Sequence, residues 1–71
     1  MKSTTAKAIS EVMVSVGAQL NESIRLVRST EEDAEFIRYR DSVSRIMTIM
    51  LLEIMNPLYM EHPELKPPEL R

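Results

Sequence analysis

The sequence predicts an all-α protein: an antiparallel two-helix hairpin that pairs into a four-helix bundle homodimer, with a short C-terminal turn and a proline-rich tail. One glycine, no proline before Pro57 and only three aromatic residues argue against a β-sheet. Apolar residues recur at helical spacing in two successive segments. Between these segments, basic residues give way to acidic ones, as expected where one helix ends and another begins.

The first helix is expected at about residues 4–28 and should begin near Ser3–Thr5, whose hydroxyls can cap free backbone amides. Gly17 lies within this helix at a cost of about 1 kcal/mol relative to alanine. It either forms a strip of small residues with Ser3 and Ser10, against which another backbone packs, or is simply tolerated; we favour tolerance. The apolar face follows heptad a/d positions and is widened on both sides. It consists of Ala6, Ile9, Met13, Val16, Leu20, Ser23 and Val27, with Val12, Ile24 and Leu26 beside it.

The segment "RSTEEDAEF" predicts a tight turn at about residues 28–30. Ser29 with Glu32, or Thr30 with Asp33, has the spacing of a capping box. The acidic cluster that follows suits the positive end of a helix dipole. No glycine or proline marks this turn, so one unbroken helix is the alternative.

The second helix is expected at about residues 31–56. Its first half keeps heptad spacing through Phe36, Tyr39, Val43, Ile46 and Met50. Pro57 should end or kink the helix at Asn56, or Asn56 caps a short turn at about residues 57–62. The remainder, 63–71, is a proline-rich tail in which the triplet "PEL" occurs twice. Its leucines, Leu65 and Leu70, either fold back onto the bundle or leave a free peptide for a partner.

The stretch "IMTIMLLEIMNP" is apolar on nearly every face of a helix. A lone hairpin has no interior that could cover all of these faces, whereas two hairpins packed together enclose one core. We therefore predict a homodimer, whose interface consists of Ile46, Ile49, Met50, Leu52 and Met55. Methionine surfaces are flexible and suit binding grooves, although methionine is also ordinary core filler. A partner or ligand groove is predicted at Met47, Met55, Leu58, Tyr59 and Met60.

Composition limits the function classes. A chain of 71 residues buries too little surface to be very stable alone. Without cysteine it forms no disulfide or thiolate zinc site, and a single histidine, His62, makes no histidine-rich metal site. The formal charge of −2 gives no general attraction for nucleic acid or an anionic membrane. No apolar run reaches the roughly 18 residues that span a bilayer, and no signal-peptide core is evident.

Two residues invite a chemical role. Glu53 is the only acid within the apolar run, and is either a carboxylate of raised pKa or a rim charge paired with a lysine. We favour the rim charge, and the expected helix register places it near Ala6 and Lys7. His62 lies between two acids with no nucleophile at a useful spacing, so we read it as a solvated residue.

The sequence thus predicts a small, cytoplasmic, non-enzymatic dimer without a cofactor. It binds a protein partner as an adaptor, regulator or inhibitor. The alternative is a binder of a small apolar ligand in a methionine-lined core or groove.

Overall fold

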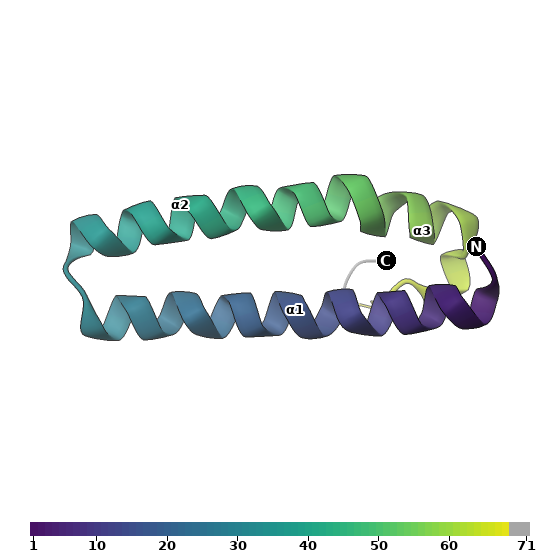
Figure 1. The fold of residues 1–71 in the computed structure, drawn as a ribbon, viewed down its shortest axis with the longest axis horizontal. Coiled ribbons are helices and arrows are strands. Elements are labelled where there is room, and N and C mark those ends of the chain that lie inside the picture. Colours follow the sequence, from purple (N-terminus) through teal and green to yellow (C-terminus); the bar gives the residue numbers. More distant parts are fainter. Residues whose placement is uncertain (69–71) are drawn as a thin grey trace.

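The computed structural model describes residues 1–68. Helix α1 (Ser3–Thr30) and helix α2 (Asp33–Ile49) lie side by side in opposite directions (Figure 1). Helix α2 continues through a π-helical segment, η1 (Met50–Met55), into α3 (Asn56–Glu61), and a 3₁₀ turn, η2 (Pro63–Leu65), follows. Within the described residues there is no strand. The predicted all-helical class and the hairpin are confirmed.

The two long helices are separated by Glu31 and Glu32, both in extended conformation. The alternative of one unbroken helix is therefore wrong, and the turn lies slightly beyond its predicted place. Neither helix start has a side-chain cap. The hydroxyls of Ser29 and Thr30 instead donate to the Leu26 carbonyl, at 2.9 and 2.8 Å. Such bonds to a preceding carbonyl keep both residues inside α1, so the predicted capping box does not form.

Helix α1 begins at Ser3, as expected, but its N-cap is Lys2 and the predicted hydroxyl cap is absent. At Gly17, a methyl group would meet no atom within 4 Å outside its own helix. No other backbone packs closely there, so the expectation that Gly17 is merely tolerated agrees with the structure.

Pro57 does not end the helix, because the preceding segment adopts π-helical hydrogen bonding. The Asn56 amide donates to the Leu51 carbonyl, five residues back, and Asn56 keeps helical angles (φ −61°, ψ −49°). In an α-helix the proline ring would collide with the carbonyl four residues earlier. In the wider π turn the residues before Pro57 bond five residues back instead. The helical run therefore reaches Glu61 and stops at His62, which precedes Pro63.

The core is small and lies between the helices. Val43 is buried near the middle of α2, and Ala6, Leu58 and Tyr59 form a buried cluster at the open end of the hairpin. Ile9, Met55 and Leu65 pack against this cluster. Leu65 therefore folds back, whereas Leu70 lies outside the described residues. Along α1, the predicted heptad face is buried or half-buried throughout, but Val12 and Leu26 are exposed.

Candidate interaction surface

Large apolar side chains of α2 and η1 remain exposed. Ile46 is 49% exposed, Ile49 60% and Leu52 58%. We call these three residues the outer face. Met50 and Met55, which were predicted to lie in the same interface, are half-buried, and Met55 packs against the cluster at the open end. Three of the five predicted interface residues are thus exposed, and two are half-buried.

The residues of the predicted groove divide between three environments. Met47 and Met55 line one shallow hollow of about 280 Å³ together with Thr48 and Leu51. Leu58 and Tyr59 are buried in the core. Met60, 84% exposed, projects beside a second hollow, near Pro63 and Lys66. A continuous groove over all five residues is not present in the folded chain.

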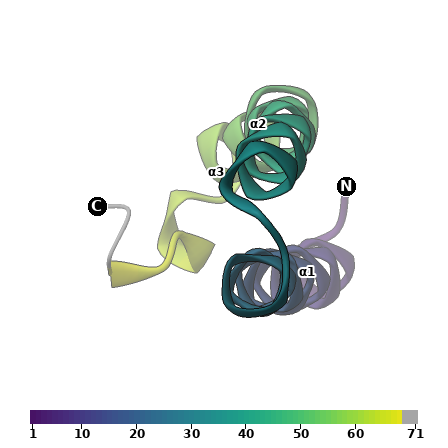
Figure 2. The same ribbon diagram turned by 90° about the vertical axis from the view of Figure 1, so that its left-hand side faces the viewer.

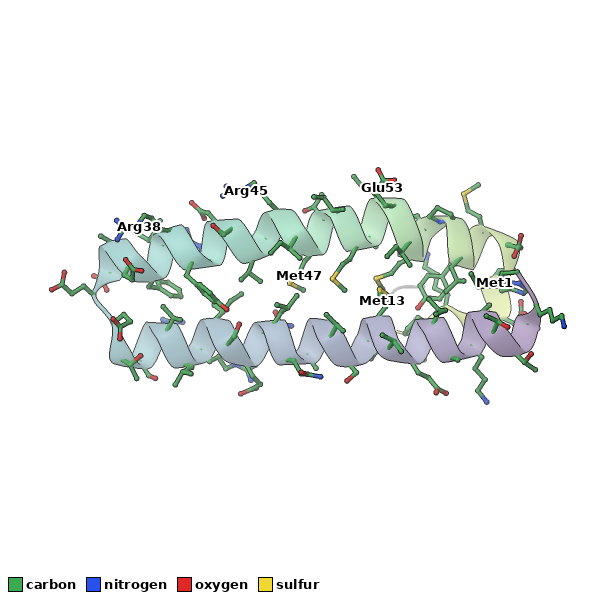
Figure 3. The ribbon with its side chains drawn as sticks, in the orientation of Figure 1. Met1, Met13, Arg38, Arg45, Met47 and Glu53 are labelled. Atoms are coloured by element: carbon green, nitrogen blue, oxygen red, sulfur yellow. The ribbon has the colours of Figure 1, made fainter. Side chains whose placement is uncertain are left out.

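Glu53 and Arg45 both project from the helix away from α1 (Figure 3). Glu53 is exposed and, among residues 1–68, forms no ion pair. The expected placement of Glu53 beside Ala6 and Lys7 is wrong, because Ala6 packs against Leu58 and Tyr59 instead. The turn falls later than predicted, and the π-helical segment places more residues in each turn, so the helices pair in a different register.

Two tyrosine–serine hydrogen bonds fix that register. The Tyr39 hydroxyl donates to Ser23 Oγ at 2.7 Å, and Ser10 Oγ and the Tyr59 hydroxyl share a buried bond of 2.6 Å. Ser23 and Tyr39 were expected on apolar faces, Ser10 in a possible strip of small residues and Tyr59 in the predicted groove. The available signal was the presence of both residue types in the helices. A buried tyrosine hydroxyl needs a polar partner, and serines on α1 can supply one.

The two flanks of the hairpin differ. Seen along the helices, the C-terminal segment lies on one side and the N-terminus on the other (Figure 2). We call the side with the N-terminus the open flank; Ile9 and Ile54 line one hollow there with Met1. At 100° per residue, one exposed stripe of α1 continues from Ile9 along this flank and is uncharged as far as Gln19. This uncharged stripe consists of Thr5, Ala8, Val12, Ser15 and Gln19, and Glu22 and Leu26 follow it on the same line.

The N-terminus and the end of α3 are joined by a polar cluster. The Met1 ammonium lies 2.8 Å from Glu61 Oε1, and His62 Nε2 donates to the Met1 carbonyl at 2.9 Å. The bond to this carbonyl raises the pKa of His62, with a further contribution from the Glu61 charge. The ammonium lowers the pKa of Glu61. These contacts hold the N-terminus against the C-terminal end of α3.

The described residues contain no group of three His, Asp or Glu side chains able to hold a metal ion. None of the helices in residues 1–68 combines the length and apolarity needed to cross a bilayer.

Comparison with protein-family models, curated proteins and solved structures finds no match to this chain.

Proposed function

We propose that the hairpin functions as a non-enzymatic homodimer, a four-helix bundle that binds a protein partner as an adaptor, regulator or inhibitor. The observation that carries this proposal is the accessible surface of 5335 Å². A folded monomer of 8.2 kDa is expected to expose about 4,500 Å². The excess of about 800 Å² equals the area that one partner contributes to a standard protein interface.

The small core supports the same proposal. No large side chain of the described residues is completely buried, and the elongated chain measures 44 × 19 × 16 Å. Burial of apolar area stabilises by roughly 25 cal/mol per Å², so covering the outer face would contribute more than any surface ion pair. A second hairpin supplies that cover with the same helix-on-helix packing.

Sedimentation equilibrium at micromolar concentration tests the dimer, with an expected mass of twice 8.2 kDa. A cooperatively folded monomer at that concentration would refute it. Capture of partners by the tagged chain, read by mass spectrometry, then tests the adaptor role. A Leu52→Glu chain serves as control, because a partner that needs the dimer should be lost with it.

A second candidate function is binding of a small apolar ligand. It is favoured by the hollow between Met47, Leu51 and Met55, where flexible thioethers adapt to ligand shape. Native mass spectrometry of the purified protein separates the two functions. A co-purified small molecule would favour the ligand binder, and a bare dimer would favour the adaptor.

A further inference from the structure

We propose that the second copy packs antiparallel on the outer face, with the twofold axis of the dimer passing close to Ile49, so that Arg45 of each copy pairs with Glu53 of the other. This inference rests on the proposed dimer and adds its register. It commits the outer face to a second copy of this chain.

The spacing of the outer face has the symmetry that such an interface needs. In a twofold interface, residues equally far from the axis on opposite sides meet their counterparts. With the axis at Ile49, Ile46 of one copy lies opposite Leu52 of the other, so that apolar side chains cover each other. Arg45 is placed opposite Glu53, so opposite charges meet at the edge of this apolar centre. Both lie roughly 6 Å from the axis, at the 1.5 Å rise of a helix.

The charges of α2 point to the same pairing. Arg38 and Arg40 each pair with an acid of their own chain, Glu35 and Asp41 respectively. Arg45 contacts only the Ser42 hydroxyl at 3.2 Å, and no carboxylate within residues 1–68 pairs with it. Glu53, also without an ion pair in that range, is its charge complement. The two lie eight residues apart, so a helix holds them about 12 Å from each other within one chain.

The neighbouring surface allows the approach. A shallow apolar hollow beside Ile49, lined by Ser44, Arg45 and Thr48, can receive side chains of the second copy. On α1, the uncharged stripe of the open flank contains small residues, Ala8 and Ser15, next to Val12. Depletion of charge at the centre of a surface is typical of protein interfaces. Two copies can therefore meet through both helices, which completes a four-helix bundle.

Charge reversal tests the register. Arg45→Glu and Glu53→Arg should each weaken the dimer by about tenfold or more, because both symmetric pairs change from attraction to repulsion. The double variant Arg45→Glu/Glu53→Arg should regain the wild-type dissociation constant. An equimolar mixture of the two single variants should form a heterodimer by native mass spectrometry, because only that combination restores both pairs.

Matched controls carry the same change of charge elsewhere. Lys7→Glu and Glu11→Arg lie outside the outer face and the uncharged stripe, and should leave the dissociation constant within about twofold. If the single variants dimerise as tightly as wild type, or their mixture shows no preference for the heterodimer, the register is wrong. A monomeric wild type would instead refute the dimer itself, so the two failures are distinguishable.

Discussion

At the scale of residues, the hairpin depends on a few polar contacts between mostly apolar helices. The buried Ser10–Tyr59 bond lies beside the Ala6–Leu58 contact, whereas the Tyr39–Ser23 bond is only half-buried. Ser23 also donates to the Leu20 carbonyl at 2.7 Å, so it keeps a partner without Tyr39. The two bonds are similar in chemistry and different in burial.

Tyr59→Phe should therefore destabilise more than Tyr39→Phe. Loss of the buried partner of Ser10 is expected to lower the free energy of unfolding by about 1–2 kcal/mol, since a buried polar group left unpaired costs most. Thermal unfolding at one fixed protein concentration measures the difference. In the double variant Ser10→Ala/Tyr59→Phe, the cost should be less than additive. Equal effects of the two tyrosine substitutions would contradict the importance of burial.

The cluster of Met1, Glu61 and His62 predicts a pH dependence of stability. Because folding raises the pKa of His62, its contribution is complete below the ordinary value of 6.5 and is lost as pH rises through the folded value. Because folding lowers the pKa of Glu61, its contribution is present above the ordinary value of 4.5 and is lost as pH falls through the folded value. Melting temperature should therefore be highest between these limits.

The variant His62→Gln isolates the upper limit of this window. It keeps a donor for the Met1 carbonyl but does not titrate. Its melting temperature should fall less than that of wild type between pH 6 and pH 8. Parallel curves for the two proteins would show that another group is responsible.

At the scale of elements, apolar periodicity predicted the helices and the half-buried face of α1. Two local departures were not predictable from that pattern. The hydroxyls of Ser29 and Thr30 can cap a new helix or bond back to the old one, and capping spacing alone does not decide between them. Pro57 could stop a helix or be accommodated by a π turn. The choice depends on the packing of Leu58 and Tyr59 beyond it, which the sequence shows only as more apolar residues.

Apolar periodicity also predicted only some of the exposed positions of the candidate surface. Ile49 and Leu52 lie off the heptad face of the second helix, and both are exposed. Ile46 keeps heptad spacing and is nevertheless half exposed. It lies at the edge of the apolar face of α2, which a single helix α1 is too narrow to cover. Met55 lies in the π-helical segment, where the regular spacing no longer holds, and it packs against the core cluster.

The fold-back of the tail gives a prediction at this scale. Leu65→Ala should lower the melting temperature, because the leucine packs against the Ala6, Leu58 and Tyr59 cluster. A half-buried leucine is expected to contribute about 1–2 kcal/mol, which corresponds to roughly 4–15 °C in a chain of this size. Met60→Ala is the control, since its side chain is almost fully exposed. If both variants melt at the same temperature, the tail is not a structural element.

At the scale of the whole molecule, two exposed valines of α1 distinguish its flanks. Val12 lies on the uncharged stripe of the open flank, whereas Val14, like Ser10, lies towards the side of the C-terminal segment. They are 49% and 50% exposed, so the two sites match in residue type, helix and exposure. Any effect of a new charge on helix propensity or net charge should therefore be nearly the same at both.

Val12 and Val14 differ only in their position relative to a second copy. Val12→Glu should weaken the dimer by about tenfold or more, because two carboxylates, one from each copy, would enter a surface that becomes dry on assembly. Val14→Glu should leave the dissociation constant near the wild-type value. Circular dichroism confirms equal helicity at high concentration, and sedimentation equilibrium measures both constants. If Val14→Glu dissociates the dimer and Val12→Glu does not, the copies meet through the opposite flank, and the tail then belongs to the interface.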